Sequence, residues 1–159
     1  MSKVLAIDPA KCTSCRVCEL VCSEKHVGAY RPSRAHIRVA VYAEDAIYLP
    51  MVCMQCDDAP CIPVCPSGAL VRDAPTNAVV VVEERCVGCR MCALACPFGA
   101  ISYWDGKARK CDLCDGDPEC VHFCAPLALR FEAEERSTTP TREAFANRLR
   151  DTLREVATP

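Results

Sequence analysis

Sixteen cysteines fall into four groups of four, and their spacing constrains this chain more than any other feature of its sequence. Two groups share one pattern, in which three cysteines stand three residues apart and the fourth follows four residues later. The other two groups are spaced more loosely, and no cysteine is left over. In chain order the groups are Cys12, Cys15, Cys18 and Cys22; Cys53, Cys56, Cys61 and Cys65; Cys86, Cys89, Cys92 and Cys96; and Cys111, Cys114, Cys120 and Cys124.

A chain of 159 residues with so many cysteines needs cross-links, which can be disulfides, zinc or iron–sulfur clusters. Disulfides fit poorly because the N-terminus shows no export signal. Zinc sites usually combine two separated Cys-x2-Cys pairs, whereas here three cysteines stand at i, i+3 and i+6. With a fourth cysteine and a proline, as at Cys96-Pro97, this is the bacterial iron–sulfur run whose last cysteine ligates a second cluster. The pattern predicts four [4Fe–4S] clusters held by all sixteen cysteines.

The charge of the chain argues against binding to nucleic acids. The formal charge is −2 at pH 7; each oxidised cluster with its four thiolates adds −2, so the loaded protein carries about −10. Proteins that bind nucleic acids present a basic surface instead. The longest aliphatic run, Ala78 to Val82, is far shorter than the roughly 20 residues that span a membrane. We therefore expect a cytoplasmic protein with no membrane span and no nucleic-acid partner.

An α+β fold is expected, because short strand patterns alternate with cysteine groups. Asp105-Gly106 is a strong hairpin signal between residues 101–104 and 107–110. After Cys22 a helix should run on until Gly28. The other expected strands are 4–7, 36–42 with 46–52, and 70–71 with 79–82. Three groups are followed by similar segments, an internal repeat: Pro66-Ser67-Gly68-Ala69-Leu70, Pro97-Phe98-Gly99-Ala100-Ile101, and Ala125-Pro126-Leu127-Ala128-Leu129, where the additional alanine is compatible with a shifted helix start.

Two-cluster ferredoxins are built from two cysteine groups that exchange their fourth ligands. Four groups therefore predict two bacterial-ferredoxin-like lobes. If the second and third groups pair, an inner lobe (about 50–104) lies nested within an outer lobe (about 1–35 plus 105–131), and a hairpin insertion occupies about 36–52. Pairing of the first group with the second, and of the third with the fourth, is equally compatible with the spacing. The hairpin is expected either to cover a cluster or to be a plain surface hairpin.

The stretch from about Ile7 to Leu129 resembles the four-cluster iron–sulfur subunits of the DMSO reductase, formate dehydrogenase and carbon-monoxide-linked hydrogenase families. It is most similar to the small electron-transfer subunit of bacterial tungsten-dependent aldehyde oxidoreductases. The segments that carry the resemblance are Pro9-Ala10-Lys11-Cys12-Thr13-Ser14-Cys15, Cys18-Glu19-Leu20-Val21-Cys22, Cys53-Met54-Gln55-Cys56, Pro60-Cys61, Cys96-Pro97-Phe98-Gly99-Ala100-Ile101 and Lys110-Cys111-Asp112-Leu113-Cys114.

The resemblance implies the nested pairing and a set of ligands for each cluster. It also implies an oxidoreductase catalytic subunit of the tungsten or molybdenum type as partner, and we further expect a flavin-containing subunit. The implied ligand sets are Cys12, Cys15, Cys18 and Cys124; Cys22, Cys111, Cys114 and Cys120; Cys53, Cys56, Cys61 and Cys96; and Cys65, Cys86, Cys89 and Cys92.

Residues 132–159 contain no cysteine and are predicted to be a linker and a C-terminal docking helix. Thr139-Pro140 provides an N-cap followed by proline at the first helical position. The helix either packs on its own subunit or docks on a neighbour, and docking on identical copies would give a filament when the rotation does not close. Its apolar residues recur at helical spacing: Phe145, Leu149, Leu153 and Val156.

The remaining residues of interest have a structural and a functional interpretation. The three histidines, His26, His36 and His122, are expected at the surface or in packing because every cluster already has four thiolates. Tyr103 and Trp104 are expected to exclude water rather than to lie between clusters. The cations Lys107, Arg109 and Lys110 either raise the potential of a nearby cluster or form a solvated strand edge.

No catalytic motif accompanies the cysteines: a glycine-rich nucleotide loop, a nucleophile elbow and the C-x3-C-x2-C run of radical enzymes are all absent from the sequence. The sequence therefore predicts an electron carrier without a catalytic site of its own. The alternatives are a free polyferredoxin, a subunit of a hydrogenase, formate dehydrogenase or DMSO-reductase-type complex, and a zinc-stapled interaction module.

Overall fold

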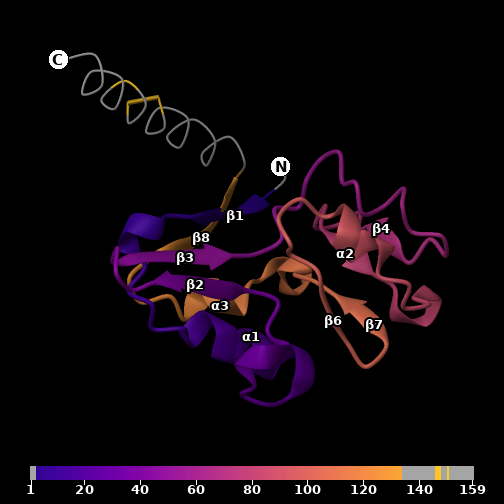
Figure 1. Cartoon of the computed structure of the whole chain (residues 1–159), viewed down its shortest axis with the longest axis horizontal. Helices are drawn as coiled ribbons and strands as arrows, with labels where there is room; N and C mark the ends of the chain where they lie inside the picture. The colour runs from indigo at the N-terminus through magenta and orange to yellow at the C-terminus, as the bar shows by residue number, and fades with distance from the viewer. Residues whose placement is uncertain (1–2, 134–145, 148–149, 151–159) are drawn as a thin grey trace.

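The computed structural model describes residues 3–133, 146–147 and 150. Within this part, four two-stranded antiparallel sheets alternate with short helices around the cysteines (Figure 1). The arrangement agrees with the expected α+β class. The strands are β1 (Lys3–Ile7), β2 (Arg38–Tyr42), β3 (Ile47–Met51), β4 (Leu70–Arg72), β5 (Val79–Val81), β6 (Ser102–Trp104), β7 (Lys107–Arg109) and β8 (Leu129–Ala133).

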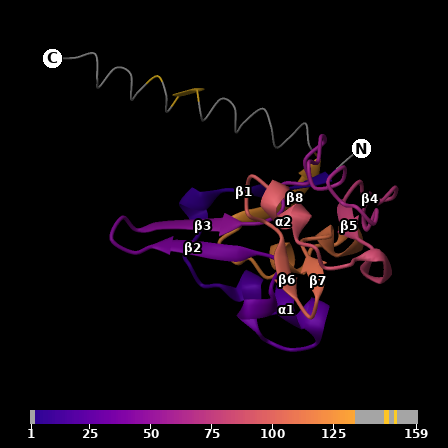
Figure 2. The ribbon, with the colours of Figure 1, turned by 45° about the vertical axis from the view of Figure 1, so that its right-hand side comes forward.

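Three of the sheets are hairpins that the sequence predicts. β2 pairs with β3, β4 with β5, and β6 with β7. At the tip of β6–β7 both Asp105 and Gly106 have positive φ, 53° and 72°. Positive φ at both central residues is what a tight primed turn requires. Figure 2 shows β2–β3 extending beside β1 and β8.

The fourth sheet joins distant parts of the chain. β1 pairs with β8 in antiparallel register, with Ile7 opposite Leu129. The segment before the first cysteine group therefore lies against the segment after the fourth. This closure is what an outer unit containing both ends of the cysteine body needs, and it supports the nested arrangement, which stays a prediction at this point.

The helices are α1 (Val17–Val27), α2 (Met91–Ala95) and α3 (Glu119–His122). Gly28 ends α1 in the left-handed conformation at φ 63°, and its N–H donates to the Glu24 carbonyl at 2.7 Å. A glycine adopts this conformation without a Cβ penalty. α1 packs against α3. One-turn 3-10 helices complete the body: η1 (Pro9–Lys11), η2 (Pro32–Arg34), η3 (Glu83–Arg85) and η4 (Leu113–Gly116).

The buried apolar residues form two cores. The first core includes Ile37, Leu113 and Leu129. The second core includes Leu70, Val79 and Ile101. Because each core also contains buried cysteines, inorganic clusters would substitute for part of the hydrophobic interior that a chain of this length can build.

One buried carboxylate fastens the hairpin β2–β3 to α1. Glu19 is 0% exposed, and its carboxylate accepts from the Val39 N–H at 2.7 Å. The Arg16 guanidinium donates to the other oxygen at 2.7 and 3.0 Å. A buried charge held by a backbone donor and a cation is fully satisfied, so the hairpin is anchored to the helix that carries Cys18 and Cys22.

The predicted C-terminal docking helix lies almost wholly outside the described residues. Of residues 132–159, the structure describes 132–133 at the end of β8, and 146–147 and 150, which are helical and exposed. Phe145, Leu149, Leu153 and Val156 are outside the described part. Within the described part, no helix is long and apolar enough to cross a membrane.

Candidate metal centres

Three cavities are each lined by four cysteines. Within each cavity the four cysteines come from two different groups of the sequence. We name the sets that line them site 1 (Cys12, Cys15, Cys18 and Cys124), site 3 (Cys53, Cys56, Cys61 and Cys96) and site 4 (Cys65, Cys86, Cys89 and Cys92). The remaining four cysteines form site 2 (Cys22, Cys111, Cys114 and Cys120).

The thiols of site 2 also lie close together. Burial raises the pKa of Cys120, and negative charge on Cys111, Cys22 and Cys114 raises it further. Cys22, Cys111 and Cys120 are all buried in the first core. The structure thus brings the cysteines together in the four sets that the resemblance implies.

Burial disfavours a free thiolate at these positions. It raises the pKa of Cys18 and of Cys111 to about 12, and that of Cys114 to about 11. Buried thiols with such pKa values need a cationic metal to become thiolates. All sixteen cysteines lie in the described part, and none forms a disulfide there. The donor set is therefore suited to iron.

The loops around the second cysteine of each group share an unusual backbone. The residue before that cysteine has positive φ in all four groups, and three of these four residues are not glycine. A left-handed residue in such a loop turns successive N–H groups toward one side, which makes a concave site for negative charge. Strain of this kind persists where a site requires it. The residues are Ser14 (φ 58°), Gln55 (50°), Gly88 (76°) and Leu113 (62°).

Backbone N–H groups also point at the sulfurs. His36 N lies 3.2 Å from Cys22 Sγ, and Ala69 N lies 3.2 Å from Cys65 Sγ. Ala100 N is 3.4 Å from Cys96 Sγ. Hydrogen bonds to ligand sulfurs are one of the means by which a protein sets the potential of an iron–sulfur cluster.

The repeated segments after the cysteine groups close in the same way. Gly68, Gly99 and Leu127 each have positive φ. Each donates its N–H to the carbonyl of the cysteine three residues earlier. The extra alanine before Pro126 therefore shifts the proline and not the turn, because Leu127 takes the left-handed conformation that glycine has in the other two segments.

The hairpin β2–β3 covers site 1. Val39 of β2 and Pro50 of β3 line its cavity together with Phe123 and Leu129. Of the two interpretations of this hairpin, the structure favours cluster cover over a plain surface element. The anchor through Glu19 holds Val39 at the cavity.

The histidines differ in their surroundings. His36 stacks between His26, at 4.1 Å between ring centroids, and Trp104, at 5.5 Å. Burial lowers the pKa of His36 to about 4, so its ring is neutral at pH 7. His26 Nε2 lies 3.9 Å from Cys114 Sγ and 3.6 Å from the Asp112 carboxylate. His122 is exposed and pairs with Asp117. His36 and His122 match the packing and surface roles expected, whereas the sequence analysis missed the position of His26 beside a ligand.

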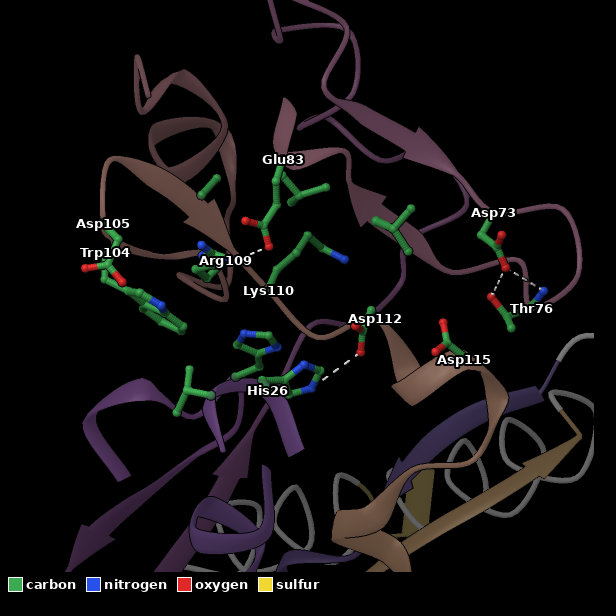
Figure 3. A pocket seen from close by; sticks show the side chains of 15 residues that line it. His26, Asp73, Thr76, Glu83, Trp104, Asp105, Arg109, Lys110, Asp112 and Asp115 are labelled. Carbon is green, nitrogen blue, oxygen red and sulfur yellow. Dashed lines mark hydrogen bonds and ion pairs between the residues drawn. The ribbon is translucent and has the colours of Figure 1, made fainter. Parts of the chain in front are cut away.

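A polar cavity of about 340 Å³ lies next to site 2. Figure 3 shows its lining, in which His26 and Asp112 face Trp104, Arg109 and Lys110 across the space. Trp104 lies beneath two cations, with the guanidinium carbons of Arg34 and Arg109 at 5.4 and 5.8 Å from its ring centroid. The packing interpretation of Trp104 therefore agrees with its contacts.

Comparison with known proteins agrees with this geometry. A family model described as a 4Fe-4S dicluster domain matches residues 44–134. The chain belongs to the 4Fe-4S dicluster domain family. With its sixteen cysteines, this dicluster protein binds four [4Fe–4S] clusters.

Three relatives illustrate the family. The polyferredoxin-like subunit of aliphatic sulfonate oxidoreductase from Pyrococcus furiosus is 44% identical over 122 residues, which cover 76% of this chain and 70% of that protein. An iron-sulfur protein of Rhodospirillum rubrum is 34% identical over 96% of this chain and 94% of its own length. The electron transport protein HydN of Escherichia coli is 34% identical over 81% of this chain and 87% of its own length.

Proposed function

We propose that this dicluster protein relays electrons between the catalytic subunit of an oxidoreductase and a second redox partner. Sites 1 to 4 would each hold one [4Fe–4S] cluster with their four cysteines as ligands. A cluster with four thiolates has no open iron for a substrate, so the protein would carry electrons and leave the chemistry to its partner.

The arrangement of the four sites supports a single path. Sites 1 and 2 are adjacent because Cys18 and Cys22 both lie on α1. Sites 3 and 4 are adjacent because Cys92 lies on α2 and Cys96 caps its end. Sites 2 and 3 meet where negative charge on Cys53 acts on the Cys111 thiol. The order along the path is therefore 1, 2, 3 and 4.

The observation that carries the proposal is which cysteines reach the surface. Only Cys15 and Cys89 are exposed among the sixteen. They belong to sites 1 and 4, the two ends of the path, whereas both middle sites have only buried or half-buried cysteines. Apolar side chains accompany both exposed ends: Phe123 and Leu127 near site 1, Val87 and Leu94 near site 4. A relay needs this design, with an entrance and an exit that partners can approach.

For the catalytic partner we propose a tungsten- or molybdenum-type oxidoreductase, with an aldehyde oxidoreductase as the first candidate and a flavin-containing subunit as the second redox partner. The resemblance of the segments around Cys12, Cys53 and Cys111 supports this assignment. Anaerobic isolation of the native complex tests it. We expect a tungsten or molybdenum enzyme to co-purify, and an aldehyde to bleach the iron–sulfur absorbance of the complex. A protein isolated alone, with clusters that no co-purified enzyme reduces, would instead identify a free polyferredoxin.

Removal of residues 140–159 is expected to release the protein from its complex. Phe145, Leu149, Leu153 and Val156 form an apolar pattern in a segment too short to be a stable helix alone in water. Each would contribute about 1.5–3 kcal/mol if fully buried on a neighbour. That neighbour is either the catalytic subunit or another copy of the chain, and head-to-tail copies would form a filament.

The measurement is the mass of the anaerobic complex in solution. A truncated protein with all its irons, all its partners and an unchanged assembly size would contradict the docking role. The matched control replaces the exposed Arg150 by alanine, which leaves the four apolar residues in place.

A further inference from the structure

Lys110 is a buried cation at the junction of sites 2 and 3. It follows β7 directly, precedes the ligand Cys111, and has only 3% of its surface exposed. Its side chain lines the cavity of site 3 and also the polar cavity beside site 2. A lysine is almost never fully buried without partners, so its position requires an explanation.

Three acceptors hold the ammonium group in place. Nζ donates to the Val79 carbonyl, to the Cys111 carbonyl at 2.8 Å and to Gln55 Oε1 at 3.5 Å. An ammonium group has three donors and no acceptor, so these contacts satisfy it in its charged form. The side chain is thus fixed rather than free to turn toward water.

Gln55 completes the same network from the other side. Its amide nitrogen donates to the Cys111 carbonyl at 2.9 Å, and its amide oxygen accepts from the Val79 N–H at 2.8 Å. Gln55 stands between the site 3 ligands Cys53 and Cys56 in the sequence. One network of hydrogen bonds therefore ties a loop of site 3 to the backbone of a site 2 ligand, with Lys110 at its centre.

The charge of Lys110 acts on thiols of both sites. Burial raises the pKa of Cys61 in site 3 and of Cys111 in site 2, and in both cases Lys110 opposes that rise. In the described part of the chain, no carboxylate forms an ion pair with Lys110. Its field is therefore directed at the two cluster sites.

The neighbouring Arg109 provides a contrast. Its guanidinium pairs with the Glu83 carboxylate and lies over the Trp104 ring. Figure 3 shows the two side chains pointing in opposite directions, Arg109 toward Glu83 and Lys110 away from it. Adjacent residues of the chain thus place one neutralised cation on one side and one uncompensated cation between the clusters.

We propose that Lys110 raises the reduction potentials of the clusters at sites 2 and 3 together. The inference rests on the proposed assignment of clusters to the four sites. Each cluster gains one electron from the reduced cluster beside it, which is oxidised in the same step, and its core charge falls from +2 to +1. A fixed positive charge in a medium of low dielectric stabilises the reduced state. Electrons entering at either end would then collect in the middle of the path.

The test is a potentiometric titration of the loaded protein followed by electron paramagnetic resonance. Lys110→Met removes the charge and keeps most of the side-chain bulk, and Lys110→Gln keeps a hydrogen-bond donor without the charge. In both variants we expect two of the four reduction steps to move to lower potential and the other two to stay in place. In the control Arg109→Gln we expect all four steps to stay where they are in the parent protein.

Two results would overturn the inference. One is that all four steps keep their potentials in Lys110→Met, and the other is that all four move by the same amount. If the lysine variants fail to assemble clusters, Gln55→Glu provides the answer, because a carboxylate beside Nζ cancels its charge and should lower the same two steps. Unchanged steps in a fully loaded Gln55→Glu protein would then contradict the proposal. A parent protein that lacks four clusters would refute the cluster assignment itself and not the role of Lys110.

Discussion

Replacement of Gly88 by alanine is expected to abolish the cluster at site 4 and to leave the other three in place. A Cβ at this position would lie 2.1 Å from the Tyr103 hydroxyl oxygen and 2.6 Å from the Gly106 carbonyl oxygen. Both are far inside van der Waals contact, and the second is backbone. Gly88 lies between the ligands Cys86 and Cys89, so a shift of this loop displaces two thiolates at once. The iron content should fall by about four irons per chain.

Tyr103 makes the loop still less tolerant. Its hydroxyl lies 2.6 Å from the Gly88 carbonyl oxygen and 2.8 Å from the Gly106 carbonyl oxygen, and the Arg90 guanidinium stacks on its ring at 4.5 Å. The loop of site 4 and the tip of β6–β7 are thus held together at the point where the new methyl group would enter.

Gly99→Ala is the matched control. Gly99 also has positive φ, at 59°, but nothing lies within 4 Å of a Cβ added there. Its cost is limited to the conformational penalty of about 1 kcal/mol, so this variant should keep all its irons. Iron analysis of the two purified proteins decides the matter. A Gly88→Ala protein with the iron content of Gly99→Ala would contradict the account of this loop.

Cys22→Ala and Cys114→Ala are expected to change the same paramagnetic signal, although 92 positions separate them in the sequence. Both belong to site 2, where each removal leaves one iron without its thiolate. Cys18→Ala should change a different signal, even though Cys18 and Cys22 lie on the same helix. Sequence proximity and cluster membership therefore predict opposite outcomes.

Electron paramagnetic resonance of the reduced variants measures this directly. Cys56→Ala is the informative comparison, because Cys56 lines site 3. If the first cysteine group paired with the second, Cys22 would serve a cluster together with cysteines of the second group. Loss of one and the same signal in Cys22→Ala and Cys56→Ala would therefore overturn the nested arrangement.

The local elements of this fold are readable from the sequence because their signals are local. Asp105-Gly106 predicts the turn of β6–β7, and Gly28 predicts the end of α1. The cysteine spacing predicts the clusters for the same reason, since three ligands of sites 1 and 4 lie within seven residues. Pairing by spacing alone leaves two arrangements open, because the fourth ligand arrives from a distant segment.

Features that depend on distant packing are not readable in this way. The left-handed conformations of Ser14, Gln55 and Leu113 give no sign in the sequence, because these residue types seldom adopt them. The burial of Lys110 depends on the carbonyl of Val79 and on Gln55, which lie 31 and 55 positions away. Sequence analysis could therefore only offer a tuning cation and a solvated strand edge as equal alternatives.

Elemental analysis of the anaerobically purified protein, combined with its absorbance before and after dithionite, tests the central claim most directly. Four complete ligand sets predict about sixteen irons and as many sulfides per chain, with an absorbance at about 400 nm that bleaches on reduction. Saturation at about eight irons after careful reconstitution would show that two of the four sites hold no cluster. Stoichiometric zinc in a colourless protein would contradict the account altogether.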